Sequence, residues 1–143
     1  MEKPVILLDE GARDVGLAEM MFNLIRQNLE QNPQKIKSFN SLDAKVMIEA
    51  RDIQIIIGLE FKQGKLTISK DSSFKPDLHI ITDSATILAL CLLKIKFGLP
   101  YFFDTNGFLV FKKLLTRKLI IKGLLSHFPA LVKLTKVFSV VRN

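Results

Sequence analysis

The spacing of apolar residues in this 143-residue chain changes from helical to alternating between residues 31 and 44. Residues 17–31 place apolar side chains every three or four positions, which predicts an amphipathic helix. Residues 44–50 and 53–59 place them at every second position, which is typical of half-buried strands. Asn32-Pro33 ends the helix, because the residue before a proline is pushed out of the helical region. The two periods together require a helix layer packed against a sheet.

Further segments of each period complete the predicted order of elements. Asp83 or Ser84 is a good N-cap for a second helix, and the turn residues Gln63-Gly64 separate two strands. The predicted strands are 44–50, 53–59, 66–68, 77–82 and 117–122, and the predicted helical segments are 17–31, 85–96, 105–115 and 125–140. This order predicts an α+β fold in which helices cover one face of a five-stranded, largely antiparallel sheet.

We assign residues 1–16 to an N-terminal extension and residues 17–143 to a single domain. Within the extension, Val5–Leu8 suits either a short strand or an anchoring arm, while Gly11 and Gly16 weaken a helix. A domain of this length buries roughly 68–70% of its unfolded surface, so it needs neither a disulfide nor a metal to fold. The mean hydropathy of +0.26 is high for a soluble protein, which indicates either a generous core or apolar surface reserved for a ligand or partner.

Cysteine content and hydropathy favour the cytoplasm. Cys91 is the only cysteine, so no intrachain disulfide can form. No run reaches the ~18–20 apolar residues that a membrane span requires, and Val5–Leu8 is too short for the core of a signal peptide. We therefore expect a cytoplasmic protein.

Positive charge is concentrated in the C-terminal third. Residues 94–143 carry ten Lys or Arg against the single acid Asp104, a net charge of +9, whereas residues 1–93 carry 11 basic and 13 acidic residues. A basic segment of this kind indicates an anionic partner, although a solvated face without a dedicated partner fits as well. Phe108 and Phe111 lie in apolar runs that favour burial over base stacking. No RNA-recognition or helix-turn-helix signature is present, so we expect no nucleic-acid partner.

No group of side chains in the sequence suits catalysis. One cysteine and the two distant histidines, His79 and His127, do not make a zinc site, and the seven glycines form no phosphate-binding pattern. Asp77 and Asp83 bracket a predicted strand and would lie roughly 20 Å apart, so turn and capping roles suit them better than acid–base chemistry. We therefore expect a non-enzyme without a bound metal or cofactor.

Several blocks of the sequence follow one another in a recognisable order. They are Val46-Met-Ile-Glu-Ala-Arg-Asp52, Gly64-Lys-Leu-Thr-Ile68, Lys75-Pro-Asp-Leu-His-Ile-Ile-Thr-Asp83 and Leu114-Leu-Thr-Arg-Lys-Leu-Ile-Ile-Lys-Gly123, followed by the closing helix. Their order and spacing resemble the sterol carrier protein-2 domain family, also called the nonspecific lipid-transfer fold. The resemblance implies helices that enclose an apolar cavity, which would bind and transfer a sterol, fatty acyl chain, phospholipid or polyprenyl compound without catalysis or a cofactor.

The residues alone leave open whether the apolar helix faces fill one another or enclose a pocket. Together with the resemblance, they predict a lipid-binding cavity with apolar lining side chains. The predicted lining residues are Ile48, Ile55, Ile57, Leu78, Ile80, Leu88, Leu92, Phe102, Phe108, Phe111, Leu119, Ile121, Phe128, Leu131, Val132 and Phe138.

The basic residues predict a transient contact with an anionic membrane surface. The residues assigned to that surface are Lys112, Lys113, Arg117 and Lys118. The alternative is a protein-interaction module or an accessory subunit, in which the apolar surplus forms a dimer or partner interface. The resemblance to the sterol carrier protein-2 family implies isoprenoid-quinone synthesis as one example of a process for such a subunit. The oligomeric state, a dimer included, stays open at this point.

Overall fold

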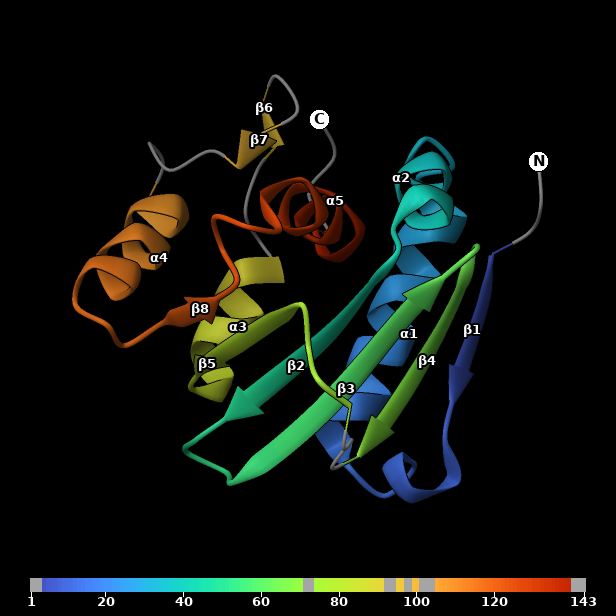
Figure 1. Cartoon of the computed structure of the whole chain (residues 1–143), viewed down its shortest axis with the longest axis horizontal. Coiled ribbons are helices and arrows are strands. Elements are labelled where there is room, and N and C mark those ends of the chain that lie inside the picture. The colour runs from blue at the N-terminus through green and yellow to red at the C-terminus, as the bar shows by residue number, and fades with distance from the viewer. Residues whose placement is uncertain (1–3, 71–73, 92–94, 97–98, 101–104, 140–143) are drawn as a thin grey trace.

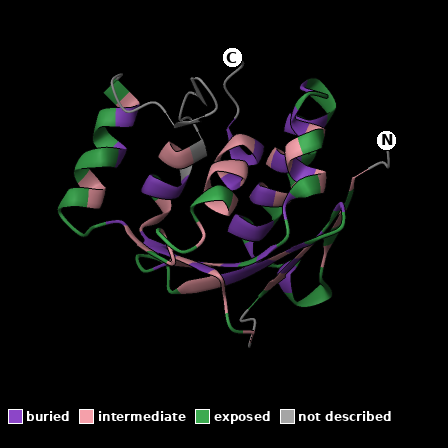
Figure 2. Ribbon diagram, turned by 45° about the horizontal axis from the view of Figure 1, so that its top comes forward, coloured by how far each residue is buried: buried purple, intermediate pink, exposed green. Residues whose placement is uncertain are grey.

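A six-stranded mixed sheet carries a layer of helices on one face in the computed structural model, which describes residues 4–70, 74–91, 95–96, 99–100 and 105–139. Figure 2 shows this arrangement edge-on, with the helices above the sheet. The elements in chain order are β1 (Val5–Leu8), the 3-10 turn η1 (Glu10–Ala12), α1 (Gly16–Gln31), α2 (Lys35–Ser41), β2 (Ala44–Ala50), β3 (Ile55–Lys62), β4 (Lys65–Lys70), β5 (Leu78–Thr82), α3 (Ser84–Cys91), β6 (Ile95–Lys96), β7 (Leu99–Pro100), α4 (Thr105–Leu115), β8 (Ile120–Lys122) and α5 (Phe128–Phe138). The α+β class and the one-sided helix layer were both predicted.

The sheet differs from the prediction in strand number and in direction. Its order among the described residues is β1-β4-β3-β2-β5-β8, so there are six strands rather than five, and β1 is the added one (Figure 1). The β2-β3-β4 meander is antiparallel as expected, but β1 runs parallel to β4, and β5 runs parallel to β2. Alternation predicts that a segment is a strand, but it carries no information about strand direction.

One face of the sheet is buried under the helices. In β2, Ala44, Val46, Ile48 and Ala50 are buried, while Lys45 is exposed. The register aligns Val46 with Leu59 and Leu78, so apolar side chains from neighbouring strands form continuous rows. These rows belong to one hydrophobic core with buried side chains of α1, α2 and α5, and each Å² of apolar surface removed from water contributes roughly 25 cal/mol to stability.

The first helix forms where its period predicts it, and a short second helix was missed. α1 buries Met21, Ile25 and Leu29, and its backbone ends at Asn32 as predicted. α2 has seven residues, too few to show a helical period, yet it buries Phe39 edge-on against Phe61 with ring centroids 5.9 Å apart.

Several predicted boundaries differ from the observed ones. The helix predicted over 85–96 is helical over Ser84–Cys91, and Ile95–Lys96 instead pairs with Leu99–Pro100 as a two-residue ladder. The strand predicted from residue 117 begins at Ile120, because Arg117 takes a φ of 60° in the turn after α4. The strand predicted from residue 53 begins at Ile55, after Gln54 with a φ of 53°.

The closing helix begins at Phe128 rather than at residue 125. Pro129 lies in its first turn, where the missing N–H does no harm, and Leu125 precedes the helix with 91% of its surface exposed. Within the described ranges, no helix combines the length and the hydropathy of a membrane span.

Candidate functional site

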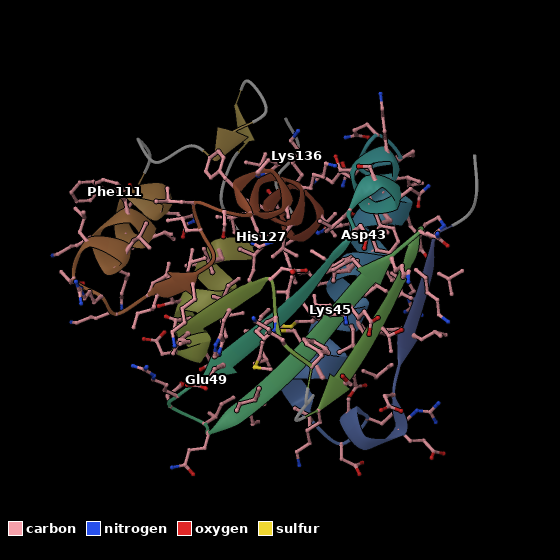
Figure 3. All side chains as sticks on the ribbon, in the orientation of Figure 1. Asp43, Lys45, Glu49, Phe111, His127 and Lys136 are labelled. Atoms are coloured by element: carbon pink, nitrogen blue, oxygen red, sulfur yellow. The ribbon has the colours of Figure 1, made fainter. Side chains whose placement is uncertain are left out.

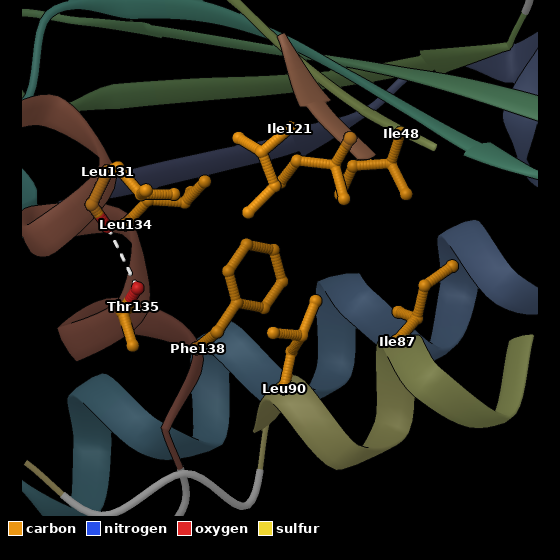
Figure 4. A pocket seen from close by; sticks show the side chains of 9 residues that line it. Ile48, Ile87, Leu90, Ile121, Leu131, Leu134, Thr135 and Phe138 are labelled. Carbon is orange, nitrogen blue, oxygen red and sulfur yellow. Dashed lines mark hydrogen bonds between the residues drawn. The ribbon is translucent and has the colours of Figure 1, made fainter. Parts of the chain in front are cut away.

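A small apolar pocket lies between α3, α5 and the β2–β5–β8 side of the sheet (Figure 4). The sheet contributes Ile48, Ile80 and Ile121, which the register places side by side on the helix-facing side. The helix residues that complete its lining are Ile87 and Leu90 of α3 with Leu131, Leu134, Thr135 and Phe138 of α5.

Helical spacing brings the α5 residues to the pocket together. Positions 131, 134, 135 and 138 follow the three- and four-residue rule, so they share one face of the helix. The ring of Phe138, in the last turn, projects between Ile121 and Leu90 in Figure 4. The pocket is therefore bounded by two helices and one sheet, with Phe138 reaching from one side toward the other.

The pocket offers a ligand almost no hydrogen bonding. Thr135 has the one polar side chain among the described lining residues, and its hydroxyl donates to the Leu131 carbonyl at 2.8 Å. That hydroxyl is already bonded within α5, so the lining presents methyl, methylene and ring surfaces. Such a lining selects for hydrocarbon and selects against polar molecules, because a buried polar group without a partner costs about 1–3 kcal/mol.

The volume of the pocket is small. It encloses about 40 Å³, whereas sites for drug-sized ligands enclose roughly 300–1,000 Å³. In this geometry the apolar helix faces largely fill one another, so a lipid tail requires the walls to separate.

The C-terminal end of α5 is anchored by two buried polar side chains. The Asn28 amide donates to the carbonyls of Val137 and Phe138 at 3.0 and 3.1 Å, and the Lys35 ammonium donates to the Ser139 carbonyl. These carbonyls belong to the last turn, where a helix lacks internal partners and its dipole favours a cation. Burial lowers the pKa of Lys35. The anchors hold the helix end that carries Phe138.

The N-terminal end of α5 is fastened through a Ser–His–Asp series of contacts. Ser126 Oγ lies 3.1 Å from His127 Nδ1, and His127 Nε2 lies 3.6 Å from Asp77 Oδ1. The other Asp77 oxygen accepts from the Lys45 backbone N–H at 2.9 Å (Figure 3 labels Lys45 and His127). All three side chains are well hydrated, and the series joins loop 123–127 to the start of β5.

Comparison with known proteins gives a clear structural match. No protein-family model matches the sequence, and no curated protein matches it significantly. Among solved structures, the chain is similar to a UbiJ-SCP2 ubiquinone synthesis protein, with a TM-score of 0.57 and 13% identity over 86% of this chain and 95% of the other. It is also similar to sterol carrier protein 2, with a TM-score of 0.51 and 14% identity over 88% of this chain and 95% of the other. The chain has the sterol carrier protein 2 fold.

The sterol carrier fold brings together part of the predicted lining. Ile48, Ile80, Ile121, Leu131 and Phe138 all border the pocket. The remaining predicted residues lie elsewhere: Ile57, Leu78 and Leu119 are buried in the core outside the pocket, Ile55 and Val132 are half-buried, Phe108, Phe111 and Phe128 are exposed, and the side chains of Leu88, Leu92 and Phe102 fall outside the described residues.

Sequence reasoning missed four residues that line the pocket. Leu134 and Thr135 follow from Leu131 by helical spacing, so this signal was present. Ile87 and Leu90 lie in α3, which is apolar on nearly all sides, and no period identified their face.

The basic residues predicted for a membrane surface divide into two groups. Lys112, Arg117 and Lys118 are exposed on α4 and the turn after it. Lys113 is half-buried, and its Nζ lies 3.5 Å from Asp83 Oδ2. Asp83 also caps α3 by accepting from the Thr86 N–H at 2.7 Å, and the bond with Thr86 lowers the pKa of Asp83. The capping role expected for Asp83 is thus observed.

The burial expected for Phe108 and Phe111 was wrong. Their exposed fractions are 62% and 38% (Figure 3 labels Phe111 on α4). The apolar run 108–111 suggests a buried segment when the sequence alone is considered. In the structure α4 packs on α3 through Gly107 and Val110, so the side chains of both phenylalanines point outward.

The remaining histidine lies on the opposite side of the sheet. His79 alternates with Leu78 and Ile80 and therefore faces away from the helices. Its Nε2 lies 3.9 Å from Glu49 Oε1, and burial is the main cause that lowers the pKa of His79. Within the part of the chain that the structure describes, no three His, Cys, Asp or Glu side chains gather as a metal site.

Proposed function

We propose that this protein binds an apolar lipid, without catalysis, between α3, α5 and the sheet. The observation that carries the proposal is the composition of the pocket: its described lining is hydrocarbon apart from one hydroxyl that is already bonded inside α5. The similarity of the fold to sterol carrier protein 2 supports the same conclusion. Each methylene moved from water into such a site contributes about 0.8 kcal/mol, so an acyl chain binds without polar contacts.

Binding requires the pocket to widen, and the two helix walls differ in how they are held. α5 is anchored at both ends, through Asp77 at its start and through Asn28 and Lys35 at its end. α3 is joined to Asp52 near its N-terminus, where the Ser84 N–H donates at 2.8 Å, and its C-terminal half is joined to α4, whose Asn106 amide donates to the Ala89 carbonyl at 2.9 Å. We propose that a lipid enters when the C-terminal half of α3, which carries Leu90, moves together with α4 away from Phe138.

The test is binding of a fluorescent long-chain fatty acid to the purified chain, with native mass spectrometry to detect co-purified lipid. Leu131→Gln places an amide in the pocket and should weaken binding at least tenfold. Val132→Gln is the matched control, because it makes the same change one residue away at a half-buried position outside the lining. Leu131→Met keeps volume and polarity and should bind as the unchanged chain does. Absence of binding by the unchanged chain, or equal loss in both Gln variants, would refute pocket binding.

A second candidate is an accessory subunit that presents a polyprenyl lipid to a partner. Two observations favour it: the similarity to a protein described as a ubiquinone synthesis protein, and exposed apolar side chains such as Phe108, Leu115 and Phe128. Size-exclusion chromatography with light scattering separates the candidates in part, because a tight dimer with no lipid bound supports an interface over a pocket. A polyprenyl alcohol that competes with the fatty acid for the pocket supports lipid presentation.

A further inference from the structure

The outward face of α4 is apolar, which is the reverse of the usual pattern for a surface helix. The exposed fractions of Phe108, Leu109 and Leu115 are 62%, 52% and 68%, and Phe111 is also exposed. A helix that covers a soluble domain normally turns polar residues to water. α1 of this chain does so, since its exposed positions include Glu19, Asn23, Arg26, Gln27 and Glu30.

The packing of α4 fixes which of its faces points outward. Gly107 and Val110 are buried on the side of α3, where the Asn106 amide donates to the Ala89 carbonyl at 2.9 Å. The Lys113 side chain extends to the same side, where its ammonium lies near the Asp83 carboxylate. Positions 108, 111 and 115 follow helical spacing on the other side, so their side chains form one stripe along the helix. Figures 1 and 2 show α4 at the edge of the molecule remote from β1, with exposed residues along it.

Positive charge flanks the apolar stripe. Lys112 lies on the exposed side of α4, and Arg117 and Lys118 are exposed in the turn that follows Leu115. That turn is held by bonds from the Lys118 and Leu119 N–H groups to the Lys113 carbonyl, at 2.9 and 3.0 Å. The sequence has no Asp or Glu after residue 104, so no acidic side chain from this end of the chain neutralises these charges. We name Phe108, Leu109, Phe111, Lys112, Leu115, Arg117 and Lys118 the α4 surface.

We propose that the α4 surface docks on an anionic lipid bilayer, with Phe108 and Leu115 among the acyl chains and Lys112, Arg117 and Lys118 at the headgroups. Apolar residues beside Lys and Arg are the composition of helices that lie in a membrane interface. Net positive charge selects the anionic bilayer over a neutral apolar partner. α4 packs on α3, whose Ile87 and Leu90 border the pocket, so docking brings this wall close to the lipid source. The docking itself does not depend on the proposed function.

Co-sedimentation with vesicles tests the docking. The full chain should bind vesicles of phosphatidylcholine mixed with phosphatidylglycerol, bind pure phosphatidylcholine vesicles much more weakly, and dissociate in high salt. The double variant Arg117→Gln/Lys118→Gln should lower the partition coefficient by roughly tenfold or more, since each basic residue near an anionic surface contributes about fivefold. Phe108→Ser/Leu115→Ser should lower it on every vesicle type.

Matched controls lie at the opposite edge of the sheet. Val5→Ser/Leu7→Ser removes two apolar side chains that are also exposed, and Lys62→Gln/Lys65→Gln removes two exposed charges at the β3–β4 turn. Both controls should bind vesicles as the unchanged chain does. Because all of these side chains are exposed, the variants should keep the far-ultraviolet circular dichroism of the unchanged chain.

Three results would overturn the proposal: equal binding to neutral and anionic vesicles, α4-surface variants that bind like the controls, or a dimer that Phe108→Ser/Leu115→Ser dissociates. The last result would show that a second copy of the chain covers the α4 surface. Fatty-acid binding without vesicles, measured on the same variants, separates the two hypotheses. If the α4-surface variants still bind fatty acid but no longer bind vesicles, membrane docking and pocket binding are separate properties. If the chain binds vesicles but no fatty acid, the proposed pocket binding is wrong and the docking proposal stands.

Discussion

The contacts of Asn28 with the end of α5 lead to a quantitative prediction. The buried Asn28 amide bridges two carbonyls of the last helical turn, at 3.0 and 3.1 Å, from a residue more than a hundred positions away in the chain. Asn28→Ala removes both donors. A buried carbonyl left without its partner costs about 1–3 kcal/mol, and water that enters the vacated space recovers part of this. We expect the free energy of unfolding to fall by about 2–4 kcal/mol.

Urea denaturation followed by circular dichroism measures this change. A loss of that size should lower the denaturation midpoint without altering the m-value, and should lower Tm by roughly 10 °C for a domain of this length. Asn23→Ala is the matched control, because Asn23 lies on the same helix, is exposed, and makes one exposed contact with Arg26. Its effect should stay within about 0.5 kcal/mol.

The same variant also tests the link between the anchor and the pocket. Phe138, whose carbonyl accepts one of the two bonds, has its ring in the pocket. Loosening this end of α5 should therefore weaken fatty-acid binding in Asn28→Ala and leave it unchanged in Asn23→Ala. The reasoning is refuted if the two variants have equal unfolding free energies, since the buried bonds would then contribute nothing to stability.

Two further substitutions test the turn before α5 and the buried lysine at its C-terminal end. Gly123→Ala should destabilise the fold by at least about 2 kcal/mol, because the φ of Gly123 is +87° and an added Cβ would lie 2.1 Å from the Asp77 carbonyl oxygen. Gly11→Ala is the control, because an added Cβ at Gly11 would meet nothing within 4 Å. Equal Tm values for the two variants would contradict this prediction. Lys35→Met should change the pH dependence of stability. Burial lowers the folded pKa of Lys35 below its ordinary 10.5, so the unfolded chain binds more protons between the two values and the contribution of Lys35 rises with pH across that alkaline window. The stability of the unchanged chain minus that of Lys35→Met should therefore increase toward pH 10.5, and a flat or falling difference in urea titrations would disprove the assignment.

Some elements could be predicted from sequence because their signal is local. Alternation in 44–50 and the turn at Gln63-Gly64, with φ of 49° and 75°, led to the β2-β3-β4 meander without knowledge of other segments. The helix over Gly16–Gln31 likewise follows from its own period and from Asn32-Pro33. β1 was ambiguous because four apolar residues fit a strand or an arm equally, and its pairing with β4 depends on a segment about sixty residues away.

The lining of the pocket was also predicted only where the signal is local. Ile48, Ile80 and Ile121 were predicted because each lies at an inward position of a strand, and the register then makes them neighbours. The α3 residues were missed because an all-apolar helix has no face that sequence distinguishes. Phe108 and Phe111 were placed inside because hydrophobic runs are usually buried, yet α4 packs on α3 through its Gly107 and Val110 side and its opposite side meets water.

By itself, the sequence determined the α+β class, the helix-facing side of each central strand and the concentration of positive charge after residue 93. These properties follow from the order of residues along short segments. Only the tertiary structure decided the sixth strand, the two parallel pairs, the small volume of the pocket and the outward face of α4. Each of these depends on which distant segments meet. Packing stabilises the fold only when two such surfaces come into contact, so its free energy cannot be derived from the sequence of one segment.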